Sequence, residues 1–236
     1  MYWGYYGYYF DPTYILVIIG ALITIWAQFR VKSTFTKYSL VYSRSGMTAS
    51  EVATNILHRN GIYDLTVDRV AGNLTDHYDP RSRTLKLSDS TYGSTSVAAI
   101  GVAAHECGHA IQHNQDYIPL KVRNSIVPVV NICSTLSWPI ILIGIIMSFN
   151  QGLINFGIIL FSAVVLFQLV TLPVEFNASN RALAILNTQG FLYDNENAMA
   201  KKVLKAAALT YVAAVASSIL QLLRLVLLFG GKRRDD

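Results

Sequence analysis

The chain has 236 residues, of which 53% are hydrophobic and 14% are charged, and its formal net charge is +5. Ordinary soluble domains carry about a quarter charged residues, so this composition excludes a typical soluble protein and indicates a membrane protein. Its two cysteines, Cys107 and Cys133, exclude a disulfide framework and favour a reducing compartment for the polar part of the chain.

Four apolar runs each approach the roughly 20 residues that a helix needs to cross a bilayer. They cover residues 14–29, 126–149, 153–174 and 206–229. The first run follows a tyrosine-rich start that contains no Lys or Arg, and no small-residue cleavage site comes after it. This pattern is typical of an anchor with an aromatic interfacial belt and not of a signal peptide. We therefore predict a mainly α-helical integral membrane protein with about four transmembrane helices.

The basic residues indicate which side the polar segments face. None of the 19 Lys and Arg precedes the first run or lies in the link FNQG between the second and third runs. Eleven lie in residues 30–123, and four lie in residues 181–205. The positive-inside rule places these segments in the cytoplasm of a multi-pass protein of the cell membrane. Topology and contact with the anionic lipid bilayer then explain the net charge, and no nucleic-acid partner is expected.

This pattern divides the chain into five parts: an anchor at 1–30, a cytoplasmic α+β region at 31–125, a transmembrane hairpin at 126–174, a cytoplasmic segment at 175–205, and an apolar helix with a basic tail at 206–236. The last part leaves two alternatives. A complete fourth span would send the tail KRRDD outside and place Arg224 within an apolar helix, whereas a partial or interfacial helix would not. We favour the complete span.

The cytoplasmic region begins with a capped helix. In MTASEVATNILHRNGI, Thr48 is the expected N-cap, Glu51 is its capping-box partner, and Gly61 follows the end of the helix. Two β-like runs come next, LTVDRV and LTDHYDPRSRTLKLS, and DPRSR divides the second run into a hairpin. Fewer than 80 residues precede the next helix, which is too few for a large independent core. The region should therefore pack on the membrane helices.

The helix expected at 96–114 carries the pattern H-E-x-x-H in the form HECGH. His105 and His109 would lie one turn apart on one face, with about 6 Å between their Cβ atoms, which suits two ligands of one tetrahedral zinc. Glu106 lies about 100° around the helix and can reach the open metal position, where it would take the proton of a zinc-bound water. The apolar run before the motif and the strands before that run are the context that the pattern requires.

A catalytic zinc of this kind needs a third protein ligand. His113 would lie about 12 Å from His105 along the helix axis, which is too far. The longer pattern H-E-x-x-H-x-x-G-x-x-H is excluded, because positions 112 and 115 are both Gln. Glu175, in TLPVEFNASNRA at the end of the third apolar run, is the remaining candidate. The hairpin returns the chain to its starting side, and a metal would offset the cost of burying a carboxylate at the membrane boundary.

HECGH, followed after a hydrophobic hairpin by LPVEFNAS, resembles the bacterial neutral zinc membrane metallopeptidases of the YugP-like group over essentially the whole chain. That group is similar to the heat-shock and CaaX-prenyl membrane zinc proteases, which have H-E-x-x-H and a later glutamate ligand. The resemblance implies a gluzincin-like region with one zinc ion on His105, His109 and Glu175, and with Glu106 as the base. The wider set has Asp four residues after the ligand glutamate, where this chain has Ser179; a hydroxyl can still bond a ligand imidazole but tunes the metal less.

Further site residues are expected with alternatives left open. Arg181, His113 and His77 are candidates for stabilising the oxyanion, and each can also be read as a structural or solvated residue. One run is either an edge strand onto which a peptide substrate adds or an ordinary hairpin strand, and it comprises Arg83, Thr84, Leu85, Lys86, Leu87 and Ser88. Cys107 would face away from the metal and serve in packing.

Three functions compete. We favour a zinc metalloendopeptidase that hydrolyses peptide or membrane-protein substrates at the cytoplasmic membrane surface. A non-catalytic membrane scaffold with structural zinc would need Cys or His in the fourth coordination position of the zinc. In such a site Glu106 would have no chemical role. An intramembrane zinc protease is disfavoured, because the chain has no Leu-Asp-Gly motif and Glu175 ends an apolar run. The sequence determines neither the substrate nor the oligomeric state.

Overall fold

The structure, a computed structural model, describes residues 11–230. The tyrosine-rich interfacial belt and the basic tail that we expected therefore lie outside the described residues. The elements in chain order are α1 (Tyr14–Ser39), α2 (Ala49–Arg59), β1 (Thr66–Val70), β2 (His77–Asp79), β3 (Thr84–Ser88), α3 (Val97–Asn114), α4 (Ile118–Ile146), α5 (Gln151–Thr188) and α6 (Asn195–Phe229).

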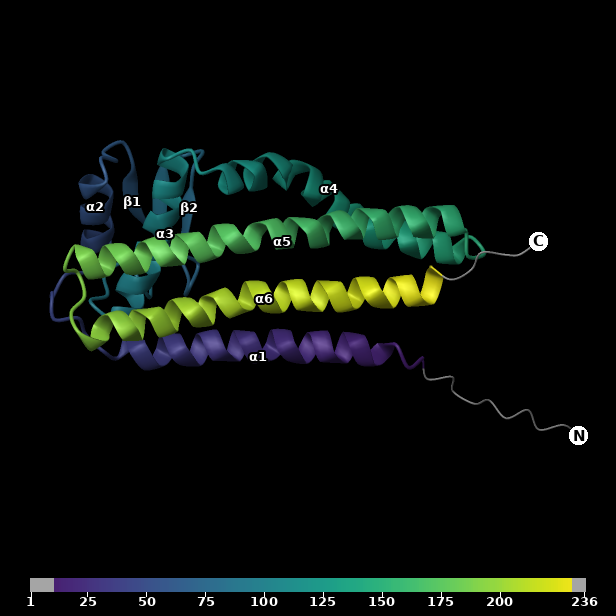
Figure 1. Ribbon diagram of the computed structural model, residues 1–236, viewed down its shortest axis with the longest axis horizontal. Coiled ribbons are helices and arrows are strands. Elements are labelled where there is room, and N and C mark those ends of the chain that lie inside the picture. The colour runs from purple at the N-terminus through teal and green to yellow at the C-terminus, as the bar shows by residue number, and fades with distance from the viewer. Residues whose placement is uncertain (1–10, 231–236) are drawn as a thin grey trace, which may run out of the picture.

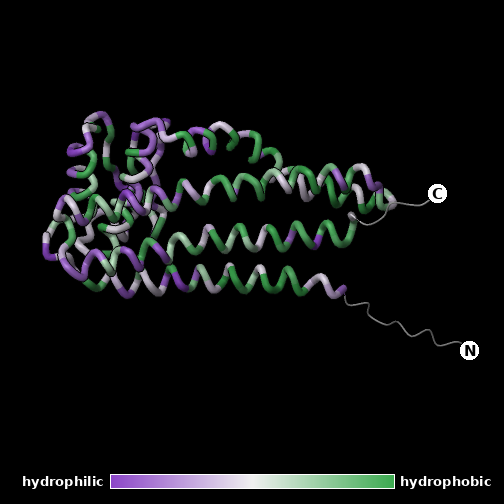
Figure 2. Tube along the Cα trace, viewed as in Figure 1, coloured by the Kyte–Doolittle hydropathy of each residue, from purple (hydrophilic) through white to green (hydrophobic). Residues whose placement is uncertain are grey.

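Within the described residues, the helices α1, α4, α5 and α6 are long and apolar enough to cross a membrane. Only 11% to 28% of each apolar window is buried inside the protein, so most of these side chains face outward and require a lipid environment. The α4–α5 turn, the start of α1 and the end of α6 lie at one end of the bundle, while α2, α3 and the sheet lie at the other (Figure 1). Polar residues gather at that second end (Figure 2). The prediction of a mainly α-helical membrane protein with four such helices is confirmed.

The helices continue beyond the apolar runs that revealed them. Helix α5 has 38 residues and is therefore about 57 Å long, whereas a bilayer core is about 30 Å thick. The part boundaries that we expected after residues 174 and 205 fall inside α5 and α6. Hydropathy detects the part of a helix that contacts lipid, but backbone hydrogen bonds keep the same helix intact in water or against other protein.

Arg224, a charged residue that the sequence predicted within an apolar helix, has an ion-pair partner from the N-terminal part of the chain. Its Nη2 atom lies 3.3 Å from Oδ2 of Asp11, and its guanidinium lies 4.3 Å from the ring centroid of Tyr14. A carboxylate and an aromatic face together offset much of the cost of a cation at this depth. Helix α6 continues past Arg224 to Phe229, as a complete fourth span requires.

The small polar region has the predicted elements. Thr48 caps α2: its Oγ1 accepts from the backbone N–H of Glu51, whose carboxylate accepts in return from the backbone N–H of Thr48. Strands β2 and β3 form the predicted antiparallel hairpin, and β1 pairs with β3 in parallel. The strand order is β1-β3-β2, which makes β3 the central strand. Of the two alternatives for residues 83–88, the edge strand that receives a peptide is excluded, since both sides of β3 are already paired, and the hairpin strand is the one observed.

The core of the polar region is shared with the long helices. One cluster of buried side chains includes Ile56 from α2, Leu87 from β3, Ile100 from α3, Leu186 from α5 and Leu204 from α6. The region therefore packs on the extensions of the membrane helices, as its small size indicated. This shared core holds α3 against α5 and α6.

Helix α3 lies unusually close to α5 at Gly108. A Cβ atom on Gly108 would lie 2.6 Å from the carbonyl oxygen of Ala178, so no larger residue fits there without a shift of backbone. Gly101, two turns earlier on α3, faces α6 with ordinary spacing, because its Cβ atom would lie 3.5 Å from Cβ of Ala200. The α3–α5 contact is thus the tighter of the two.

We predict that Gly108→Ala pushes α3 away from α5 and destabilises the protein by roughly 1–3 kcal/mol, the usual cost of overpacking. The measurement is thermal unfolding of the purified protein in detergent. Gly101→Ala is the matched control on the same helix, and it should be neutral or slightly stabilising because Ala favours the helix. Equal stability of the two variants would contradict the role assigned to the close contact.

Candidate metal centre

Helix α3 presents its two histidines toward one point. Ser96 caps the start of the helix by accepting from the backbone N–H of Ala99, and the helix then runs unbroken through the HECGH motif. The rings of His105 and His109 lie 4.7 Å apart between centroids, at 84° to each other. Residues four apart on a helix share a face, so this arrangement follows from the local structure alone.

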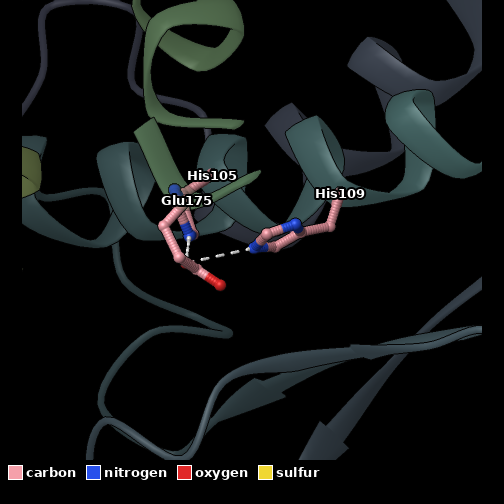
Figure 3. Close-up of side chains that lie close together, drawn as sticks. All are labelled: His105, His109 and Glu175. Atoms are coloured by element: carbon pink, nitrogen blue, oxygen red, sulfur yellow. Dashed lines mark ion pairs between the residues drawn. The ribbon is translucent and has the colours of Figure 1, made fainter. Parts of the chain in front are cut away.

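Helix α5 supplies the third residue of the site. Oε2 of Glu175 lies 3.4 Å from Nε2 of His105 and 3.5 Å from Nε2 of His109 (Figure 3). One ligand atom from each of the three residues lies within 4.8 Å of the other two. The structure thus brings together the three side chains that we expected to share a metal ion. His113 is not part of this group.

One carboxylate oxygen of Glu175 has no hydrogen-bond partner within residues 11–230, which indicates that these three side chains fit a cation. Glu175 is 2% exposed, and its Oε2 atom is buried without a hydrogen-bond partner among the described residues. A buried charge in that state is costly unless a cation shares the site. Two imidazole nitrogens and one carboxylate oxygen are also the donor set of many catalytic zinc sites.

Acidic neighbours also make the site attractive to cations. Burial lowers the pKa of His109, but Glu175 and Glu106, together with the Gln112 side chain, more than reverse that effect, and the net pKa is raised above the usual 6.5. The same negative surroundings that favour a proton on the imidazole favour a metal ion beside it. A metal and a proton would therefore compete for this site.

A buried glutamine sets the orientation of His109. Nε2 of Gln112 donates to the backbone carbonyl of Val174 at 2.9 Å and to Oδ1 of Asn177 at 3.0 Å. Both partners are acceptors, so the amide nitrogen must face them and Oε1 must face His109. That oxygen lies 3.0 Å from Nδ1 of His109 and therefore accepts a hydrogen bond from the Nδ1–H. In the neutral imidazole, Nε2 of His109 then carries no proton and can bind a metal.

Ser179 has the corresponding place beside His105, with its Oγ 3.1 Å from Nδ1 of the imidazole. This is the contact that we expected from its position four residues after Glu175. Gln112 was missed, because we had considered position 112 only for the glycine of a longer motif. The signal that could have revealed Gln112 is a polar residue three positions after a ligand histidine, within an otherwise apolar helix.

Strand β2 holds Glu106 beside the metal group, which is the set of side chains of His105, His109 and Glu175. The backbone N–H of Tyr78, in strand β2, donates to Oε2 of Glu106 at 3.0 Å. Glu106 is 9% exposed and lines the same cavity as His109 and Glu175. One carboxylate oxygen is thus anchored to the backbone of β2, which fixes the position of the side chain within the cavity.

A cavity of about 170 Å³ opens onto the metal group. Its walls come from strand β2 and helices α3, α4, α5 and α6, and its lining residues include His77, Tyr78, His113, Leu120, Arg123 and Tyr211. The sequence had not singled out Arg123 or Tyr211. A cation at the start of one apolar helix and a tyrosine within another are weak signals, because interfacial positions commonly carry both.

The three expected oxyanion candidates are placed differently. His77 and His113 line the cavity, and Nδ1 of His113 lies 2.8 Å from the hydroxyl of Tyr78. Arg181 is not among the lining residues: its Nε donates to Asn177 at 2.7 Å, and its guanidinium lies 5.7 Å from the ring centroid of Tyr117. Arg181 therefore supports the hydrogen-bond chain behind His109 and does not face a substrate.

The sequence is similar to known proteins over nearly its whole length. Residues 13–230 match the family described as "Putative neutral zinc metallopeptidase". The chain is also 51% identical over 224 residues to the "Putative membrane protease YugP" of Bacillus subtilis (strain 168), a match that covers 94% of this chain and 99% of that protein. No solved structure is a significant match to the chain.

We predict that Glu175→Ala strongly weakens zinc binding, because two neutral imidazoles leave a divalent ion without charge compensation. Loss of a residue that only hydrogen-bonds a metal ligand typically weakens metal binding by roughly 10–100-fold, and we expect a larger loss here. The measurement is metal content and zinc affinity of the purified protein. His113→Ala is the matched control and should bind zinc as the parent does, since His113 stands apart from the metal group. Full zinc content in Glu175→Ala would remove this residue from the ligand set.

Proposed function

Because the chain belongs to the family of neutral zinc metallopeptidases, we propose that it is a zinc-dependent endopeptidase that cleaves peptides or membrane proteins at the cytoplasmic surface of the cell membrane. The observation that carries the proposal is the buried Oε2 atom of Glu175, which has no hydrogen-bond partner among the described residues and lies 3.4 and 3.5 Å from the Nε2 atoms of His105 and His109, with Glu106 in the same cavity. This combination supports hydrolysis, because it provides both a metal position and a base.

A zinc ion held by His105, His109 and Glu175 would act as a Lewis acid and would lower the pKa of water in the cavity. The protein's own residues do the rest. Glu106 accepts a proton from the attacking water and can then pass it to the nitrogen of the leaving amine. The N–H of Tyr78 holds Glu106 at the correct angle for both transfers. Buried Gln112 keeps His109 in the metal-binding tautomer, and Ser179 bonds the corresponding nitrogen of His105.

Strand β2, and not β3, offers a place for the substrate. It is an edge strand, and no other strand of the described residues covers its outer side. His77 and Tyr78 of β2 line the cavity, and Tyr78 contacts Glu106. A peptide in extended conformation that lies along this edge would run past the metal group, and it would bind polar groups of the edge other than the N–H of Tyr78, which already donates to Glu106. Such binding would depend little on which side chains the peptide carries.

Tyr211 and Arg123 are the residues that we propose to stabilise the oxyanion. Both line the cavity, Tyr211 from α6 and Arg123 from the start of α4. Nε of Arg123 is buried and has no hydrogen-bond partner among the described residues, so a donor is available there. A hydroxyl and a guanidinium that converge on the attacked carbonyl are typical groups for this task.

A structural zinc scaffold has less support. Structural zinc sites usually close all four positions with Cys or His. Within residues 11–230 the metal group has three members, and its remaining side opens to the cavity. Cys107 is fully buried, its Sγ lies 3.6 Å from the carbonyl oxygen of Ala53, and burial raises the pKa of its thiol well above the usual value. It serves in packing and is no metal ligand.

We predict that Glu106→Gln keeps zinc and loses roughly 10²- to 10⁴-fold in the rate of peptide hydrolysis, because the amide cannot accept the proton. The measurement is cleavage of an unfolded protein substrate by the purified protein, together with metal analysis of the same sample. Retained cleavage with full zinc would remove the proposed base.

The same assay tests the oxyanion residues. Tyr211→Phe removes a single hydroxyl, and we expect kcat to fall by roughly a hundredfold with little change in KM when zinc is saturating. Tyr117→Phe is a suitable control, since Tyr117 lies beside Arg181 and outside the cavity. Unchanged kcat in Tyr211→Phe would leave Arg123 as the candidate donor.

The orientation of the site is open to a direct test. The positive-inside rule predicts that the α4–α5 turn lies outside the cell and that α3 lies in the cytoplasm. A reporter fused near Asn150, which precedes α5, should report an extracytoplasmic position, and a reporter in the loop after β1 should report a cytoplasmic one. The opposite pattern would place the cavity on the outer surface and contradict the cytoplasmic proposal.

A further inference from the structure

A second pocket lies between α1 and α6 and shares no lining residue with the metal cavity. Its volume is about 410 Å³. Four cations line it, two from each helix, together with three hydroxyl-bearing residues and two apolar ones: Arg30, Lys37, Lys202 and Lys205, then Ser33, Thr34 and Tyr38, then Ala206 and Leu209. The pocket has no acidic lining residue.

The positive charge of this pocket is not balanced by the protein. Helix α1 contains no Asp or Glu at all. None of the four lining cations forms an ion pair within residues 11–230, and Lys37 alone has a ring contact, 5.6 Å from the centroid of Tyr38. Like charges gathered on two packed helices repel each other, so the pocket is a favourable site for an anion.

The depth of the pocket identifies where that anion would come from. The Asp11–Arg224 pair marks the far ends of α1 and α6. Arg30 lies 16 residues beyond Tyr14, or about 24 Å along α1, and Lys205 lies 19 residues before Arg224, or about 28 Å along α6. The hydrocarbon core of a bilayer is about 30 Å thick. With the Asp11–Arg224 pair near one surface of the bilayer, the pocket cations would lie near the other surface, at the level of the lipid phosphates.

The walls of the pocket change character along the helices. The cations and hydroxyls lie toward the polar end of the protein, while Ala206 and Leu209 lead toward the apolar part of α6. A ligand that fits both parts has an anionic head and a hydrocarbon chain. We propose that the pocket binds an anionic phospholipid, with the headgroup phosphate against Arg30, Lys202 and their neighbours and the acyl chains along the α1–α6 groove.

Such a lipid would connect two helices that are distant in sequence. Helix α1 packs along α6, and Gly20 allows that approach, since a Cβ atom there would lie 2.8 Å from Oγ of Ser217. Helix α6 carries Tyr211 into the metal cavity, six residues after Lys205. Binding to the folded protein alone stabilises it by mass action, so the bound lipid should raise the temperature of unfolding.

The test uses the full chain in nanodiscs of phosphatidylcholine with increasing phosphatidylglycerol, and in detergent for native mass spectrometry. For the parent protein we expect phosphatidylglycerol to bind at least about tenfold more tightly than phosphatidylcholine and to raise the temperature of unfolding. Equal binding of the two lipids would overturn the proposal. So would displacement of the lipid by millimolar inorganic phosphate, which would indicate a site for the free ion.

Two charge-matched double variants separate a pocket from general surface charge. Arg30→Gln with Lys202→Gln removes one pocket cation from each helix. Lys32→Gln with Lys201→Gln removes two charges from the same helices, but these residues line other grooves. The first pair should weaken phosphatidylglycerol binding by roughly tenfold or more, and the second should leave it nearly unchanged. Equal loss in both pairs would overturn the proposal, and unfolding in pure phosphatidylcholine checks that each variant is folded.

Discussion

Gly108 lets α3 approach α5 so closely that a single added carbon would lie 2.6 Å from the backbone of Ala178. The metal group depends on this approach. His109 follows Gly108 directly, and Glu175 lies one turn before Ala178, so the distance between the two helices sets the distance between the imidazoles and the carboxylate. The same approach brings buried Gln112 within reach of Val174 and Asn177. A single helix contact thus controls both the ligands and the hydrogen bonds that orient them.

The long helices serve the membrane and the site together. Helices α5 and α6 each have an apolar window that faces outward, and both continue into the polar end of the protein, where they complete its core and its cavity. Glu175 and Tyr211 belong to these two helices. A small α+β region could not bury enough surface to hold a metal site by itself. The membrane helices supply that missing surface, so anchoring and site assembly depend on the same packing.

Local patterns predicted much of this protein correctly, because they depend on neighbouring residues. The capping box of Thr48 and Glu51 requires only three residues of separation, and the hairpin of β2 and β3 requires only a turn. The strand order was not predictable in the same way. Strand β1 pairs directly with β3, although β2 lies between them in the sequence, and this makes β3 the central strand and excludes the edge-strand alternative. The alternation of apolar and polar residues along a strand does not indicate whether the strand pairs on one side or on both.

The sequence by itself determined the class of protein, the four apolar helices and the facing of His105 and His109, since composition and helical periodicity act within one element. It also indicated Glu175, because an acid at the end of an apolar run needs a partner. Tertiary structure alone decided that Gln112 orients His109, that Tyr211 and Arg123 enter the cavity, and that Asp11 meets Arg224. Each of these depends on the distance between helices that are far apart in the chain. That distance is set by side-chain packing, which no periodic pattern records.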